Sequence, residues 1–112
     1  MEADDRRRSK RQSFIAFAWY HLITDEVVSE EELHGLAHSC DVSREGLGLV
    51  ASRSLPPHQK VFLKVVTSKG SFSAVGRVAN CTALDDGRYR IGVRFEILPP
   101  SDIPLIERLA GA

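Results

Sequence analysis

The sequence lacks any long apolar stretch, and this absence limits where the protein can act. No apolar run approaches the roughly 20 residues that a membrane-spanning helix requires. The charged N-terminus also lacks the apolar core of a secretory signal peptide. We therefore expect a cytoplasmic protein with no membrane insertion.

Cysteine is scarce as well, and no catalytic motif is present. Cys40 and Cys81 are the only cysteines among 112 residues, and neither belongs to a cysteine motif. Both lie in strand-like sequence, so we expect reduced, buried thiols rather than a disulfide. The sequence also contains no Ser-His-Asp arrangement, carboxylate pair or nucleotide-binding loop. We therefore expect no enzymatic activity and no cofactor.

The formal net charge of zero hides a separation of charge along the chain. Residues 6–11 hold four arginines and one lysine, whereas residues 25–32 hold five acidic side chains and no basic one. The acidic segment argues against a general nucleic-acid-binding protein, although the basic N-terminus alone could attract phosphates. The sequence assigns no role to the acidic segment.

Alternating apolar residues and turn signals predict a mainly β protein. We expect a flexible basic arm over residues 1–12 and a single domain over residues 13–112. The periodicity predicts six strands, over Ser13–Ile23, Leu33–Val42, Gly46–Ser52, Lys60–Thr67, Ser71–Leu84 and Tyr89–Ile97. Antiparallel strands at this hairpin spacing favour a small closed barrel.

The first predicted strand, Ser13–Ile23, is apolar at both parities, so we expect it to be covered on both faces. Phe17 and Trp19 are then core residues. If the barrel instead leaves their face uncovered, the two rings belong to an apolar patch that suits a partner or self-association.

A short helix is predicted at the C-terminus, where it covers part of the barrel. Pro99 and Pro100 end the last strand, Ser101 is suited to cap the helix, and Pro104 falls in its first turn. The apolar stripe of this helix consists of Leu105, Ile106 and Leu109.

Two short motifs carry the chemistry that points to a ligand. Arg7 and Arg11 form an R-x-x-x-R motif, and Asp41, Ser43 and Gly46 form a D-x-S-x-x-G motif. In an extended strand, Asp41 and Ser43 project to one face while the intervening residue and Cys40 project to the other. We therefore expect Asp41 and Ser43 on the outer surface, with the apolar positions facing the core.

These motifs, in this order, resemble a PilZ domain. The resemblance extends over nearly the whole chain and includes Leu55-Pro56-Pro57 and the segment from Arg88 to Phe95. It implies a six-stranded β-barrel with a C-terminal helix, and binding of the bacterial second messenger cyclic di-GMP. The ligand-binding residues that it implies are Arg7, Arg11, Asp41, Ser43 and Gly46.

Arg6 directly precedes the R-x-x-x-R motif. In the PilZ family an arginine at this position accompanies binding of an intercalated ligand dimer, which implies two molecules of cyclic di-GMP per protomer. Arg6 therefore joins the predicted ligand-binding residues.

The residue types suit a cyclic dinucleotide. A guanidinium group can pair with guanine O6 and N7, stack on a purine or bind phosphate. The carboxylate of Asp41 can accept from guanine N1–H and the exocyclic amine, and the hydroxyl of Ser43 can reach a phosphate. Gly46 lets the backbone pass closely beneath the ligand. The basic arm would fold over the barrel when its arginines clamp the ligand.

Three other interpretations stay open. The domain could be a PilZ-like interaction module, independent of ligand, that docks onto motility, pilus, secretion or exopolysaccharide machinery. It could be a small nucleic-acid-binding barrel, against which the acidic segment argues. A zinc site could combine His34, His38 and Cys40, which share strand parity, with Cys81, but the family resemblance turns that face toward the core.

Overall fold

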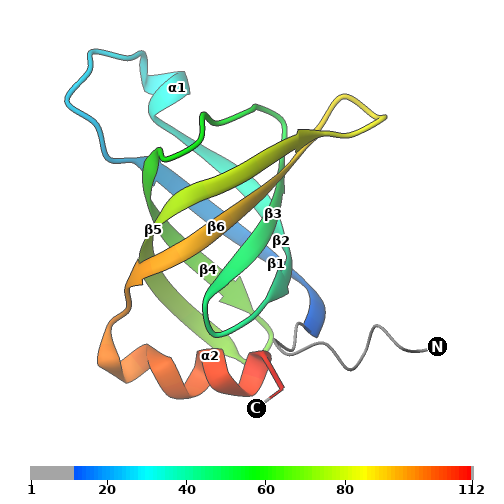
Figure 1. The fold of residues 1–112 in the computed structure, drawn as a ribbon. Coiled ribbons are helices and arrows are strands. Elements are labelled where there is room, and N and C mark those ends of the chain that lie inside the picture. The colour runs from blue at the N-terminus through cyan, green and yellow to red at the C-terminus, as the bar shows by residue number, and fades with distance from the viewer. Residues whose placement is uncertain (1–11, 112) are drawn as a thin grey trace.

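Six antiparallel strands form a closed barrel in this computed structural model, which describes residues 12–111. The strands are β1 (Gln12–Leu22), β2 (His34–Val42), β3 (Gly46–Ala51), β4 (Lys60–Thr67), β5 (Gly70–Ala83) and β6 (Tyr89–Ile97). Their order around the barrel is β1-β2-β3-β6-β5-β4, and all neighbouring pairs are antiparallel (Figure 1). The predicted barrel is confirmed, and β4 and β6 have the limits that the sequence predicts.

Apolar side chains from alternate positions of the strands fill the barrel interior. On β4 the inward residues Val61, Leu63 and Val65 are fully buried. The ring of Phe72 on β5 meets the ring of Phe95 on β6 edge-on, with 6.3 Å between the centroids. A barrel of so few strands has room inside for side chains only. The interior is therefore a packed core.

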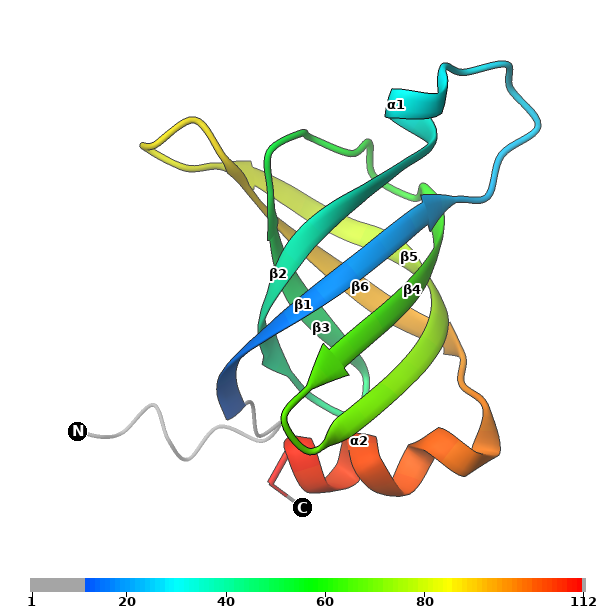
Figure 2. The ribbon, with the colours of Figure 1, turned by 180° about the vertical axis from the view of Figure 1, so that it is seen from behind.

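Strand β1 lies between β2 and β4 and has one buried face (Figure 2). Ala16 and Ala18 point inward and are buried, whereas Phe17 and Trp19 point outward with 50% and 52% of their surface exposed. The prediction that both faces of this strand are covered, with the two rings in the core, is wrong. Barrel closure buries one face of each strand, and on β1 the buried face consists of Ala16, Ala18 and Tyr20, so Phe17 and Trp19 point outward.

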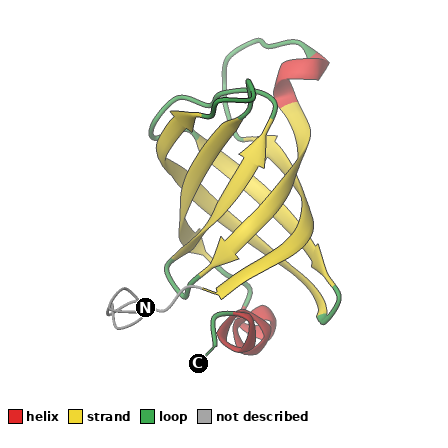
Figure 3. Ribbon diagram, turned by 90° about the vertical axis from the view of Figure 1, so that its right-hand side faces the viewer, coloured by secondary structure: helices red, strands yellow, loops and turns green. Residues whose placement is uncertain are grey.

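The barrel has two distinct ends (Figure 3). The lower end, as we call it, consists of the β2–β3 turn at residues 43–45 and the β4–β5 turn at residues 68–69, with helix α2 (Ile103–Leu109) across it. The upper end carries helix α1 (Glu30–Leu33), the loop at residues 52–59 and the β5–β6 hairpin. No helix among residues 12–111 is long and apolar enough to cross a membrane.

Strand β2 contains one more residue than β3 near the lower end. The register passes from Ser39 opposite Leu49 to Asp41 opposite Gly48. An extra residue of this kind, a β-bulge, reverses which residues face the core. Val42 is consequently buried, and Asp41 lies on the outer side of the barrel beside Gly48. The predicted orientation of these two residues is confirmed.

Before the bulge, the residues of β2 that face outward are those that the family resemblance placed toward the core. His34 and His38 are exposed, and Ala37 between them is buried. The prediction that the histidine face turns toward the core is wrong, because the bulge separates it from the residues that follow. The described part of the chain contains no group of three or more potential metal ligands. Cys81 is free but only partly buried.

Helix α2 packs its apolar stripe onto the lower end. Leu105, Ile106 and Leu109 are buried, as predicted. The cap differs from the prediction: a 3₁₀ turn (Pro100–Asp102) precedes the helix, so Asp102 rather than Ser101 is the N-cap residue. The carboxylate of Asp102 makes no capping bond and instead accepts from the backbone N–H of Ser73 at 3.0 Å. This bond ties the helix to β5.

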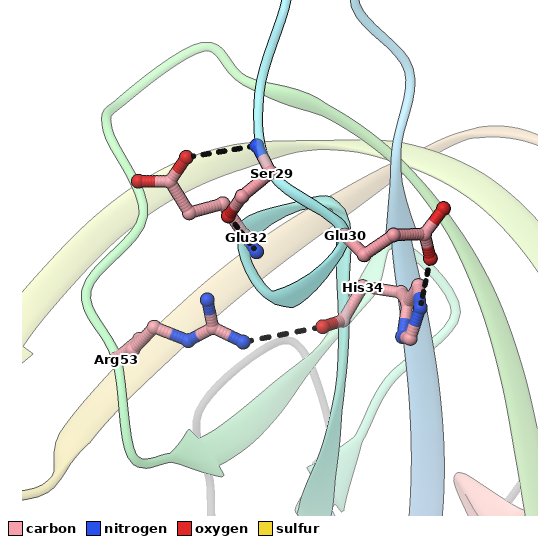
Figure 4. Close-up of polar contacts among 5 residues, drawn as sticks. All are labelled: Ser29, Glu30, Glu32, His34 and Arg53. Carbon is pink, nitrogen blue, oxygen red and sulfur yellow. Dashed lines mark hydrogen bonds and ion pairs between the residues drawn. The ribbon is translucent and has the colours of Figure 1, made fainter.

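The acidic segment contains a helical turn, α1, with its own capping box (Figure 4). The hydroxyl of Ser29 accepts from the backbone N–H of Glu32, and the Glu32 carboxylate accepts from the backbone N–H of Ser29, both at 3.2 Å. Arg53 donates to the carbonyl of His34 at 3.2 Å, and His34 Nε2 lies 3.4 Å from a carboxylate oxygen of Glu30. These bonds order the upper end.

Replacing Phe72 with alanine should destabilise the barrel by about 3–5 kcal/mol, because this ring is 1% exposed and its loss leaves a cavity. Phe62→Ala removes the same ring from the outer face of β4, where it is 41% exposed. That change should cost about 1 kcal/mol or less. Urea unfolding of the two variants measures both losses, and equal losses would contradict the assignment of inner and outer faces.

Candidate functional site

A salt bridge joins β2 to β6 on the outer surface near the lower end. Arg90 Nη2 donates to Asp41 Oδ2 at 2.6 Å. The side chain of Asp41 is 14% exposed and that of Arg90 is 40% exposed. A charge-assisted bond this short fixes the direction of the carboxylate. Asp41 therefore offers a positioned acceptor rather than a mobile surface charge.

Two glycines form a strip of backbone beside this salt bridge that carries no side chains of its own. Gly48 on β3 lies opposite Gly92 on β6. A Cβ at Gly48 would come within 2.8 Å of the Arg90 guanidinium, and one at Gly92 within 2.8 Å of the Asn80 amide. The ends of Arg90 and Asn80 thus lie directly over the backbone. We call this surface, formed by Asp41, Gly48, Asn80, Arg90 and Gly92, the glycine platform.

Ser43 lies in the β2–β3 turn rather than on the strand surface. Its side chain is buried, with 2% of the residue exposed. The hydroxyl donates to the Gly46 carbonyl at 3.4 Å and accepts from the backbone N–H of Glu45 at 3.3 Å. The expectation that Ser43 projects from the outer surface is wrong, because β2 ends at Val42 and the chain turns there. In this structure the hydroxyl stabilises the turn.

Gly46 permits close approach of two backbones. A Cβ at this position would lie 2.1 Å from the carbonyl oxygen of Val93 on β6, which is far inside contact distance. The neighbouring Glu45 carbonyl accepts from the backbone N–H of Phe95 at 2.8 Å. The sequence motif predicted a glycine beneath a ligand. The structure adds a steric reason for glycine at this position, the approach to Val93, which applies whether or not a ligand is bound.

Two hollows flank the β2–β3 turn. One, of about 190 Å³, adjoins the glycine platform and is lined in part by Ser43, Gly46 and Asn80. The other, of about 750 Å³, lies toward the C-terminal segment, with Arg44 and Arg94 in its wall. Four of the predicted or newly found site residues, Ser43, Gly46, Asn80 and Gly92, therefore line one hollow.

The N-terminal arm joins the barrel at the edge of this surface. Gln12 pairs with Val42, and Ser13 pairs with Asp41. Arg6, Arg7 and Arg11 lie outside the described residues. Their point of attachment, however, is next to the D-x-S-x-x-G motif.

Arg90, Gly48, Asn80 and Gly92 were not among the predicted site residues. Strict alternation along β6 could have placed Arg90 and Gly92 on the outer face. The pairing of Arg90 with Asp41 could not have been found in this way, because it depends on the register of β3 between them.

Alanine at Gly46 and at Gly48 should have different effects. Gly46→Ala meets backbone and should lower stability by about 2 kcal/mol, as overpacking does. Gly48→Ala meets the side-chain ends of Arg90 and Asp41 rather than backbone and should cost about 1 kcal/mol or less. Thermal unfolding distinguishes the two variants. A Gly46→Ala protein as stable as the wild type would refute the close approach to Val93.

A family model and several solved structures resemble this chain. The family model described as PilZ domain matches residues 5–112. No curated protein sequence matches. The inhibitor of motility MotI/DgrA from Bacillus subtilis has 12% identity and a TM-score of 0.72, with 94% of this chain and 49% of that chain covered.

Two further structures were solved with cyclic di-GMP. The PilZ domain of YcgR from Escherichia coli has 15% identity and a TM-score of 0.69, covering 95% of this chain and 89% of that domain. The MrkH complex from K. pneumonia has 19% identity and a TM-score of 0.64, covering 92% and 49%.

The chain spans about half the length of MotI and MrkH. Identities this low show a shared fold, whereas the family model covers nearly the whole sequence. This chain belongs to the PilZ domain family.

Proposed function

We propose that this chain is a non-enzymatic cytoplasmic receptor that binds cyclic di-GMP over the glycine platform and the β2–β3 turn. The observation that carries the proposal is the carboxylate of Asp41, which lies beside the backbone of Gly48 and next to the attachment point of the arginine-rich arm. The ligand-binding residues are Arg6, Arg7, Arg11, Asp41, Ser43 and Gly46.

The chemistry of the platform matches a purine. A flat base needs a surface without projecting side chains, and the backbone at Gly48 and Gly92 supplies one once the ends of Arg90 and Asn80 move aside. Asp41 then accepts from guanine N1–H and its exocyclic amine. Arg90 remains close enough to stack on the base or to bind a phosphate.

The arm is long enough to complete the site. Arg11 directly precedes Gln12, which pairs with Val42. Five Cα steps separate Arg7 from Gln12, so covalent geometry keeps its Cα within about 18 Å of that residue. Both arginines of the R-x-x-x-R motif can therefore reach a ligand that lies on the platform.

Signalling would follow from ordering of the arm. When its guanidinium groups engage the ligand, the arm covers part of the barrel surface and presents a new face. A component of motility, pilus, secretion or exopolysaccharide machinery would recognise that face. Ordering the arm costs conformational entropy, so the affinity for ligand should depend on the contacts that each arginine makes with it.

Cyclic di-GMP should bind the purified protein saturably, and both Asp41→Asn and Arg7→Ala should weaken binding by about tenfold to a hundredfold, the loss expected for a charged hydrogen bond. Isothermal titration calorimetry measures the affinities. Lys10→Ala, which removes a charge at a variable position of the R-x-x-x-R motif, and Asp86→Asn, at the distant β5–β6 hairpin, are the matched controls.

GTP serves as the ligand control and should not bind with comparable affinity. Wild-type affinity in Asp41→Asn would remove this carboxylate from the site. An absence of cyclic di-GMP binding in the wild-type protein would leave a docking module that acts without ligand.

Arg6 should determine stoichiometry. We expect two molecules of cyclic di-GMP per protomer in the wild-type protein and one in Arg6→Ala, because the second molecule loses its guanidinium contact. The same calorimetric titration gives the molar ratio, with Lys10→Ala again as control. A ratio of one in the wild-type protein would contradict this role.

A further inference from the structure

The outer faces of β1, β2 and β4 carry large, exposed apolar side chains. No described helix or loop lies over these three strands (Figure 2). The exposed fractions of these side chains range from 39% to 54%. We call this surface the apolar face; its members are Phe17, Trp19, Leu36, Phe62 and Val66.

Strand register makes the apolar face continuous. Trp19 lies opposite Leu36 on β2, and Phe17 lies opposite Val66 on β4. Directly opposed residues on one face of a sheet are close enough for their side chains to touch. The ring of His38 extends the face, since its centroid is 5.3 Å from that of Phe17. These side chains form one patch rather than scattered surface residues.

The size of the apolar face fits a protein interface. Its exposed apolar area is roughly 450 Å², taking about 150–250 Å² for a whole aromatic side chain. A standard interface buries about 800 Å² per partner, of which about 56–65% is apolar. The apolar face supplies most of that apolar share, and His38 and Lys64 supply polar surface beside it.

Charge at the two ends of the barrel favours a second copy of the chain as the occupant. The exposed acidic side chains of residues 25–32 lie at the upper end. At the lower end the exposed basic side chains Arg44, Lys69 and Arg108 outnumber the one exposed acidic side chain, Glu45. Two copies related by a twofold axis across the strands would bring the acidic end of each against the basic end of the other.

We propose that this protein forms a homodimer in which two apolar faces pack against each other with the barrels antiparallel. The closed barrel offers no free strand edge, so the contact is face to face. The glycine platform lies on β3, β5, β6 and the lower end of β2, outside the residues of the apolar face, so the dimer leaves it open to ligand.

Trp19 is the only tryptophan in the chain and reports directly on this contact. Its fluorescence emission should move to shorter wavelength as the protein concentration rises from about 1 to about 500 µM, a range that spans weak to moderate association. Sedimentation velocity over the same range should show a shift from monomer to dimer mass.

Variants separate this contact from non-specific association. Trp19→Glu should raise the dimer dissociation constant by about thirtyfold or more, as loss of a central aromatic does. Phe62→Ser retains Trp19. In this variant the fluorescence emission of Trp19 should stay at the longer wavelength of an exposed tryptophan as the protein concentration rises. Ile97→Ser, which alters a residue 59% exposed on β6 outside the apolar face, should dimerise like the wild type.

Circular dichroism verifies that each variant is folded. A wild-type protein that stays monomeric with constant Trp19 emission would overturn the proposal and leave the face to a different protein partner. Dimerisation of Phe62→Ser as tight as that of Ile97→Ser would overturn it as well.

Discussion

Closure of the six-stranded sheet is the constraint from which the surface properties of this protein follow. Each strand pairs on both sides, so the backbone hydrogen-bonding groups are used within the barrel. Recognition must then use side chains on the outer strand faces or the loops at the ends. Because side chains alternate along a strand, large apolar residues such as Trp19 lie on the outer surface when their neighbours Ala18 and Tyr20 face the interior.

The bulge in β2 connects this constraint to the ligand surface. Without the extra residue, Asp41 would point inward with Ala37, and a carboxylate in the packed core would be costly. The bulge turns Asp41 outward and places it within reach of Arg90 on β6. One inserted residue therefore decides whether the D-x-S-x-x-G motif faces solvent.

The strands and the barrel could be predicted from the sequence because period-two patterns and turn residues act locally. The orientation of β1 could not, because a run that is apolar at both parities does not reveal which face is covered. The buried position of Ser43 depends on where β2 ends, and the Arg90 contact depends on register across three strands. Local sequence patterns contain neither the position at which β2 ends nor the register between strands. The cap at Asp102 was missed because a 3₁₀ turn precedes the helix.

The salt bridge between Asp41 and Arg90 has a consequence for the resting protein. Because Arg90 already compensates the charge of this carboxylate, an arginine of the arm gains little attraction by approaching it when no ligand is bound. A guanine edge offers Asp41 two aligned N–H donors, and phosphates supply the negative charge that the arm needs. In the receptor that we propose, this internal neutralisation would suppress closure of the arm without ligand and so keep the background signal low.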